Sequence, residues 1–461
     1  MAISISRAAA DLRNRAADAH KAGTPAEARQ LYAAYLAMVP QDASIWSNLG
    51  ALLRAEARHD MALRAHERAY ALDPGSSVIM NNYANILSDI GHYDRALPLR
   101  RKILQADPTD QSQKAMIGKA LRALGRYAEA ITHLEAAIND HPDYAELRIQ
   151  LALSQLSDRR YAEGFRNYEV RWETGELTPR QMKTPQWDYS PLDGKTILVM
   201  PEQGFGDAVA FSRFLPLLRR YNPARVLVYA EKPMQRIFDG LDGADWVGTQ
   251  LPPGTTYDVW TNVMDLCPLH FDKTDSIPQP TRLTVPADST ARAGAVVAPH
   301  AVKFKVGIVW SGSVTYRGNA FRSFSHTEFL PLVDIPDVQL FSLYKGPNLA
   351  EYQADGSNCF IIDTASTDRD FADCAAMMQE MDLIITSDTA TAHIAGSLGV
   401  PVWTLLHWDA FWLWQHQGAT TPWYPSMDLI RQTTPRDWAG VFARVKTKLE
   451  GQVAAWKRGQ S

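Results

Sequence analysis

One repeating pattern constrains the first third of this chain more than any other feature. Prolines recur every 34 residues at Pro40, Pro74, Pro108 and Pro142. Alanines keep the same step, and so do glycines, with Ala57 filling one glycine place: Ala28, Ala62, Ala96 and Ala130, beside Gly23, Gly91 and Gly125. Because several residue types hold one period, chance is a poor explanation, and the segment should fold as a stack of similar units.

A period of 34 residues with this punctuation is typical of tetratricopeptide repeats, in which each unit is a pair of helices. In the fourth unit Ile117, Gly118 and Leu121 share one face of a predicted first helix, and Ala130 and Leu134 line the second. Small residues are needed where paired helices cross closely. A fifth unit begins as RRYAEGF and loses its closing proline. We therefore predict a repeat domain over residues 1–172 that ends in a capping segment.

Such an array presents a concave surface that grips a protein or peptide. The alternative is that it only supports the rest of the chain or mediates self-association. Polar residues on the predicted first helices are candidates for binding the backbone of an extended peptide, although solvated positions would look the same: Asn48, Asn81, Asn82 and Asn85.

Strands and helices alternate behind a connector over residues 173–192. Apolar runs such as KTILVM, ARVLVYAE and MDLIITS predict buried strands, and alternation with helices implies parallel sheets with crossovers. The predicted fold class is α + α/β. We place one half at 193–285, a linker at 286–303, a second half at 304–435 and a C-terminal helix at 436–461.

Polar turns at strand ends are the candidate sites, because ligands of parallel sheets lie at the carboxyl ends of strands. In the first half, Glu202, Gln203, Gly204 and Gly206 precede or surround Asp207 in the turn EQGFGD. Asp207 has two interpretations: a helix cap, or a general base that takes a proton from an acceptor hydroxyl.

The second half offers an anion site. Ser311, Gly312 and Ser313 can present N–H and O–H groups to a phosphate. Arg317, Arg322 and Lys345 fall in turns of the same half and add positive charge.

The turn SDTATAH follows a predicted strand and opens a helix at about Thr389. Asp388 suits sugar or ribose hydroxyls, Thr389 and Thr391 suit a diphosphate, and His393 could neutralise its charge. The alternative is that Asp388 only caps the helix and His393 is a buried core histidine.

Composition narrows the class. The chain has 461 residues and a net charge of -4, which argues against general nucleic-acid binding. Its three cysteines lack the spacing of metal ligands, so we predict no metal site. Cysteines that lie far apart are more typical of reduced packing residues than of disulfides, which suits a reducing compartment. No segment is apolar and long enough for a secretory core or a membrane span, so we expect a cytoplasmic protein.

Five motifs resemble one group of proteins. YEVRW, EQGFGD with FSRFLPLL, VGIVWSGS with FRS, SDTATAHIAGSLGVPVW and PWYPSMDLIRQ are similar to bacterial proteins that join tetratricopeptide repeats to a GT-B domain related to glycosyltransferase family 9, the heptosyltransferase family. The layout more distantly resembles protein O-GlcNAc transferases. The resemblance covers nearly the whole chain and implies two Rossmann-like halves, the first for the acceptor and the second for the nucleotide-sugar donor.

The resemblance also implies a reaction: sugar transfer from a nucleotide donor with inversion, without a metal or another cofactor. Asp207 aligns with the acidic residue proposed as base, and the turns at Ser311 and at Asp388–His393 align with donor-binding loops. Some proteins of this layout modify flagellin, which implies an O-linked protein acceptor. The chain departs from its relatives at Leu413, where they commonly carry Arg.

Two alternatives stay open at this point. The chain could be a non-catalytic adaptor with a relic GT-B half, or a transferase that acts on a glycan or lipid precursor. The sequence does not identify the sugar, the nucleotide or the acceptor, and it leaves the oligomeric state open, a homo-oligomer included.

Overall fold

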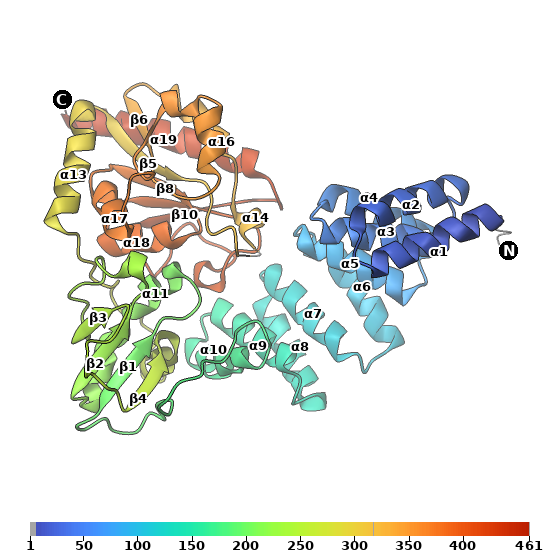
Figure 1. The fold of residues 1–461 in the computed structure, drawn as a ribbon, viewed down its shortest axis with the longest axis horizontal. Helices are drawn as coiled ribbons and strands as arrows, with labels where there is room; N and C mark the ends of the chain where they lie inside the picture. Colours follow the sequence, from blue (N-terminus) through green and yellow to red (C-terminus); the bar gives the residue numbers. More distant parts are fainter. Residues whose placement is uncertain (1–5, 317, 461) are drawn as a thin grey trace. The chain divides into compact units, whose positions relative to one another are not determined.

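The chain folds into two compact units, Met1–Ser154 and Gln155–Ser461, in a computed structural model that describes residues 6–316 and 318–460 (Figure 1). The division differs from our sequence boundary at residue 172. Residues 155–172 group with the second unit because Tyr161 and Phe165 pack on its rings: both lie against Phe271, with ring centroids 4.7 and 5.4 Å away.

The first unit is a helical solenoid of the tetratricopeptide type, as predicted. Consecutive helices pair, and Asp42, Ser76 and Asp110 cap three first helices at the 34-residue step by accepting from the N–H three residues on. The helices are α1 (Arg7–Lys21), α2 (Pro25–Met38), α3 (Ala43–Ala55), α4 (His59–Leu72), α5 (Ser77–Asp89), α6 (Tyr93–Ala106), α7 (Gln111–Ala123), α8 (Tyr127–Asp140) and α9 (Ala145–Ser157), the last of which crosses the boundary between the units.

Small residues do lie where the paired helices cross. A Cβ on Gly118 would lie 2.5 Å from the Leu134 side chain, and one on Gly50 would lie 2.6 Å from His66. His66 and Leu134 occupy the same place in the second and fourth repeats, two steps of 34 apart. His66 is fully buried, and neither ring nitrogen has a hydrogen-bond partner among the described residues.

Acid should destabilise the repeat unit through His66. Burial, helped by the nearby charge of Arg54, lowers the pKa of His66 to about 4. Between pH 6.5 and 4 the imidazole of His66 is therefore protonated in the unfolded chain and neutral in the folded unit. The free energy of unfolding should fall by up to about 3 kcal/mol as the pH drops through this range. Urea denaturation followed by circular dichroism at several pH values measures this. The His66→Leu variant, which copies the fourth repeat, should lose that part of the pH dependence; an unchanged slope would contradict the assignment.

One repeat turn carries a residue that its conformation disfavours. Gly23, Gly91 and Gly125 have φ values of 72°, 86° and 70°, and Ala57 adopts φ 57° at the equivalent place. A left-handed conformation costs a residue with a Cβ about 1 kcal/mol. Ala57→Gly should thus stabilise the array by about 0.5 kcal/mol, after the entropy that glycine gains in the unfolded chain. Thermal unfolding checks this, with Ala55→Gly within α3 as the destabilising control.

The second unit contains two parallel sheets. The first has the strand order β3-β2-β1-β4 and the second β10-β9-β8-β5-β6-β7. The strands are β1 (Thr196–Met200), β2 (Arg225–Tyr229), β3 (Trp246–Gly248), β4 (Val259–Asn262), β5 (Phe304–Val309), β6 (Val338–Ser342), β7 (Ile361–Asp363), β8 (Leu383–Ser387), β9 (Val402–Leu406) and β10 (Met427–Arg431).

Helices lie before, between and after the strands of the second unit. The α-helices are α10 (Tyr161–Asn167), α11 (Phe205–Ser212), α12 (Cys267–Phe271), α13 (Ala287–Val297), α14 (Asn319–Arg322), α15 (Leu330–Val333), α16 (Leu349–Ala354), α17 (Phe371–Gln379), α18 (Ala390–Leu398) and α19 (Trp438–Gln460). Shorter 3₁₀ turns that matter below are η1 (Tyr168–Trp172), η2 (Leu215–Tyr221), η3 (Lys232–Met234), η4 (Val263–Leu266) and η8 (Trp412–Trp414).

Three elements differ from the sequence predictions. The proposed linker 286–303 contains helix α13, whose alanines favour a helix over an open connection. The helical pattern of the segment MQRIFDGL, residues 234–241, also predicts a helix, but the segment follows the 3₁₀ turn η3 as a series of turns and reaches Gly240 at φ 68°. Strand β10 was not predicted. It lies in the motif PWYPSMDLIRQ and pairs in parallel with Val402–Leu406 of β9.

The strand orders determine where a ligand can bind. The chain starts each sheet in its middle, at β1 and at β5, and crosses to the other side at β4 and at β8. Crevices of such sheets open at the carboxyl ends of the two strands where the order reverses. The turns after β1, β5 and β8 are EQGFGD, WSGS and SDTATAH, so all three predicted turns lie at such ends.

Candidate functional site

Two helix N-termini meet at the candidate site. Helix α11 follows β1 and helix α18 follows β8, and the two helices lie side by side (Figure 1). Their closest approach is at Gly206, where a Cβ would lie 2.8 Å from the His393 ring and 3.4 Å from the Ala390 Cα. The absence of a side chain at Gly206 therefore lets the two helices pack closely. This packing brings the turn EQGFGD next to the turn SDTATAH.

Asp207 lies in the first turn of α11, at its third position. Its Oδ2 accepts a 3.1 Å hydrogen bond from the Gly204 N–H, so it supports the start of the helix without being the N-cap residue, which is Gly204. Burial raises the pKa of Asp207 to about 7, against that hydrogen bond and with help from the negative charges of Asp388 and Glu202. A half-buried carboxylate with such a pKa can accept a proton near neutral pH.

The α18 N-terminus lacks a side-chain cap. Thr389 is the N-cap residue and makes no capping hydrogen bond, so Asp388 is not the cap that one interpretation supposed. The Thr389 hydroxyl instead lies 2.5 Å from the Thr391 hydroxyl, which in turn lies 2.9 Å from the Thr386 hydroxyl. Asp388 is buried, which raises its pKa, and the charge of Arg322 opposes that shift.

His393 does not supply positive charge here. It is buried, its Nδ1 lies 3.0 Å from the Tyr424 hydroxyl, and its ring stacks on Trp414 with centroids 5.2 Å apart. Burial, together with the positive charges of Arg213 and Arg322, lowers the pKa of His393 to about 3. The ring therefore carries no positive charge at pH 7 in this arrangement, and its expected role beside a phosphate stays a prediction. Its contacts orient α18 against α11.

The WSGS turn reaches the same place. A Cβ on Gly312 would lie 2.9 Å from the Arg322 Nη2 and 2.9 Å from the Thr389 Cγ2, so the turn, the cation and the α18 N-terminus adjoin. Ser311 is buried and hydrogen-bonded to Ser323 and Asn319, at 3.0 and 3.1 Å. Ser313 is exposed. Arg317 lies outside the described residues.

Sequence reasoning missed Tyr316, an exposed residue of this turn. The Arg322 guanidinium lies 4.5 Å from the centre of its ring, a cation–π contact. Tyr316 also lies within electrostatic range of Asp207, Asp388 and Asp409. An exposed aromatic residue in a turn carries no sequence signal that could have indicated this position.

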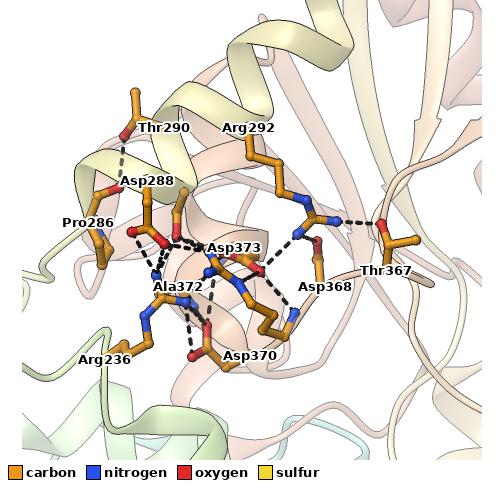
Figure 2. Close-up of polar contacts among 12 residues, drawn as sticks. Arg236, Pro286, Asp288, Thr290, Arg292, Thr367, Asp368, Asp370, Ala372 and Asp373 are labelled. Carbon is orange, nitrogen blue, oxygen red and sulfur yellow. Dashed lines mark hydrogen bonds and ion pairs between the residues drawn. The ribbon is translucent and has the colours of Figure 1, made fainter.

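Lys345 does not join the site. Its ammonium donates to the backbone oxygen of Asp368, at the edge of an ionic cluster between α13 and α17 (Figure 2). In this cluster Asp373 receives Arg292 at 2.8 Å and Arg236 at 3.4 Å. The full ionic cluster consists of Arg236, Asp288, Arg292, Asp368, Arg369, Asp370 and Asp373.

Glu202 lies in the predicted turn, and its carboxylate is paired inside the protein. Its two carboxylate oxygens receive Arg171 at 2.6 and 2.8 Å, and Arg171 also reaches Asp265 at 2.5 Å. All three side chains are buried. Gln203 is exposed at φ 60°, and its amide donates to the Tyr168 hydroxyl at 2.9 Å. The motif YEVRW therefore supports the turn that carries Asp207.

The asparagines of the repeats have partners within the array. Asn82 donates to Ser47 at 3.0 Å, Asn81 accepts from Gln113 at 2.8 Å, and Asn85 accepts from Arg100 at 3.0 Å. Asn48 is exposed. Three of the four thus join neighbouring helices, and a peptide would have to share or displace these contacts.

The site as a whole is tightly packed. Asp388, Thr389, Thr391 and His393 are each at most 9% exposed, and Leu413 is 1% exposed. Its accessible rim consists of Gly204, Asp207, Gly312, Ser313 and Arg322, which are half-buried or exposed.

Within residues 6–316 and 318–460, no group of three His, Cys, Asp or Glu side chains is arranged to hold a metal ion. Across that same part of the chain, none of the helices is apolar over a stretch long enough to cross a membrane.

Comparisons with known proteins support the repeats, and one relative is similar over nearly the whole chain. A family model described as TPR repeat matches residues 118–157. Protein FlbA of Caulobacter vibrioides is 24% identical over 468 residues, which cover 95% of this chain and 78% of FlbA. Small glutamine-rich tetratricopeptide repeat-containing protein 2 of Mycosarcoma maydis is 31% identical over 94 residues, 20% of this chain and 27% of that protein.

A solved structure, MamA 41-end from Desulfovibrio magneticus RS-1, covers 38% of this chain and 100% of its own, with 18% identity and a TM-score of 0.34. The match to the TPR repeat model and the paired helices define the N-terminal part as a tetratricopeptide-type array, a class of domain that typically mediates protein–protein interaction. The similarity to FlbA extends over the α/β unit as well.

Proposed function

We propose that this chain is an inverting, metal-independent glycosyltransferase that moves a sugar from a nucleotide-sugar donor to a protein held by its repeats. The observation that carries the proposal is the meeting of Asp207, whose pKa is raised to about 7, with the uncapped N-terminus of α18. A proton acceptor and an anion-binding helix end are the two groups that such a transfer needs.

The sheet topology supports a GT-B arrangement of two Rossmann-like halves. Numbered within its own half, the second sheet reads 3-2-1-4-5-6 and the first reads 3-2-1-4. The order 3-2-1-4-5-6 of the second sheet is that of doubly wound nucleotide-binding sheets, whose ligands lie where the strand order reverses. The donor would then bind beside Gly312, Arg322 and Thr389 at the β5 and β8 ends.

In the proposed reaction an acceptor hydroxyl oxygen attacks the anomeric carbon of the donor. Its proton goes to Asp207, and the bond from the anomeric carbon to the diphosphate oxygen breaks. Negative charge grows on the leaving diphosphate, where Arg322 and the α18 N–H groups stabilise it. His393 acts as a positioning residue through Tyr424 and Trp414.

The repeats supply the acceptor in this proposal. An O-linked protein acceptor, flagellin being one example from the resembling proteins, would lie along the array. The similarity to FlbA runs through both units at 24% identity, which supports a function that needs the repeats and the α/β unit in one chain.

A thermal-shift panel of UDP-, GDP-, ADP- and CMP-linked sugars tests the proposal on the full chain. Specific binding stabilises the folded state by mass action, so one donor class should raise the melting temperature in a saturable way. Arg322→Ala should remove the shift, whereas Arg219→Ala, in η2 at a largely exposed pair with Asp245, should keep it. Failure of every donor would remove the transferase proposal.

The packed site favours one alternative, a non-catalytic adaptor that uses only its repeats. Asp388, Thr391 and His393 contact protein groups rather than open space. The adaptor predicts partner capture that Asp207→Asn leaves unchanged, together with no nucleotide release from any donor. A transferase that acts on a glycan or lipid precursor instead predicts transfer that survives deletion of residues 1–150.

A further inference from the structure

A cavity of about 350 Å³ lies in the first half of the α/β unit, near the end of α11 opposite to Asp207. None of the predicted site residues lines it. Its lining combines arginines with prolines and a leucine: Ser212, Arg213, Pro216, Leu217, Arg220, Asp242, His270, Pro278, Gln279, Pro280, Thr281 and Arg282. Its volume lies within the range of small-molecule sites.

The lining of the cavity carries more positive than negative charge. The guanidinium of Arg213 lies over the rings of Trp423 and Tyr424, 5.1 and 4.8 Å from their centres. Arg213 is 6% exposed, and its hydrogen-bond acceptors are backbone oxygens of Ala210, Pro278 and Trp423, at 2.8, 3.1 and 3.0 Å. Among the described residues, Arg213 has no carboxylate partner, and neither have the exposed Arg220 and Arg282.

Buried cations normally pair with carboxylates, because burial removes the water that stabilises their charge. Asp242 is the one carboxylate of the lining, and no ion pair joins it to these arginines in the described part of the chain. Three guanidinium groups against one carboxylate leave about two positive charges, which match a phosphate group near neutral pH.

We propose that this cavity is a binding site for a small organic phosphate, separate from the candidate transfer site. The guanidinium groups of Arg220 and Arg282 would bind the phosphate oxygens, and Arg213 would add charge from the wall. The prolines and Leu217 would contact the organic part of the ligand. This inference does not depend on sugar transfer.

Calorimetric titration of the full chain with phenyl phosphate and with inorganic phosphate, at constant ionic strength, tests the site. Both should bind saturably, and phenyl phosphate more tightly because of the apolar wall. The Arg220→Ala/Arg282→Ala double variant should weaken both by about tenfold or more. Both side chains are exposed, so the variant should fold, and an unchanged melting temperature checks this.

Two matched variants make the result decisive. Arg219→Ala removes the neighbouring arginine, which pairs with Asp245 at 2.7 Å, and should leave phosphate binding unchanged. Arg322→Ala removes the cation of the candidate donor site, so saturable phosphate binding that persists in this variant belongs to the cavity. Absence of saturable binding, equal binding by the double variant, or loss of binding in Arg322→Ala would each overturn the proposal.

Discussion

Asp207→Asn is expected to slow sugar transfer by about 10²–10⁴-fold, the usual contribution of a general base. Asn keeps an oxygen that can accept the Gly204 N–H, so the helix start and the melting temperature should be retained. Nucleotide release from the donor identified by thermal shift measures the rate. Asp239→Asn, at an exposed position of the same half, is the matched control and should be as active as the original chain.

The pH dependence gives this prediction a second readout. Because burial raises the pKa of Asp207 to about 7, about half of the molecules carry a protonated, inactive base at neutral pH. Transfer should therefore rise with pH through a midpoint near 7, and the Asn variant should lack that step. A variant that retains its full rate would show that Asp207 only supports the start of α11.

Arg171→Met is expected to cost the α/β unit about 3–5 kcal/mol of stability. It leaves Glu202 and Asp265 buried without their shared cation, and an uncompensated buried charge is strongly destabilising. Chemical denaturation followed by tryptophan fluorescence measures the loss. Arg219→Met, at a largely exposed pair with Asp245, should cost less than about 1 kcal/mol.

The same variant should recover at low pH. Burial already raises the pKa of Glu202 even though Arg171 opposes the shift, and removing Arg171 raises that pKa further. The folded state then binds protons more readily than the unfolded chain, so the loss of stability should be smaller at pH 5 than at pH 8. A loss below about 1 kcal/mol at pH 8, or a loss that grows with acid, would contradict the ionic role of Arg171.

Local patterns predicted much of the fold. The 34-residue period indicated the repeats, and short apolar runs indicated most strands, because both signals lie within a few tens of residues. The helix N-caps Asp42 and Ser76 follow the same period and could have helped to predict the helix starts, but the residue type changes from one repeat to the next. Helix α13 was missed because its small residues are weakly patterned, although alanine favours helices.

The candidate site was predictable only as separate turns. Strand ends indicated the turns at Asp207, Ser311 and Asp388, and the structure brings these together. Two properties depend on distant neighbours and carry no local signal. Arg171 meets its carboxylates 31 and 94 residues along the chain, and His393 is neutral because of burial among rings.

The ionic cluster of Figure 2 has a mechanical consequence. Arg236 comes from the first half, and its partners Asp288, Asp370 and Asp373 belong to α13 and the start of α17. Any swing of one half away from the other must pull this guanidinium from three carboxylates. Dissolved salt weakens such attractions, so the resistance of the two halves to separation should fall as ionic strength rises.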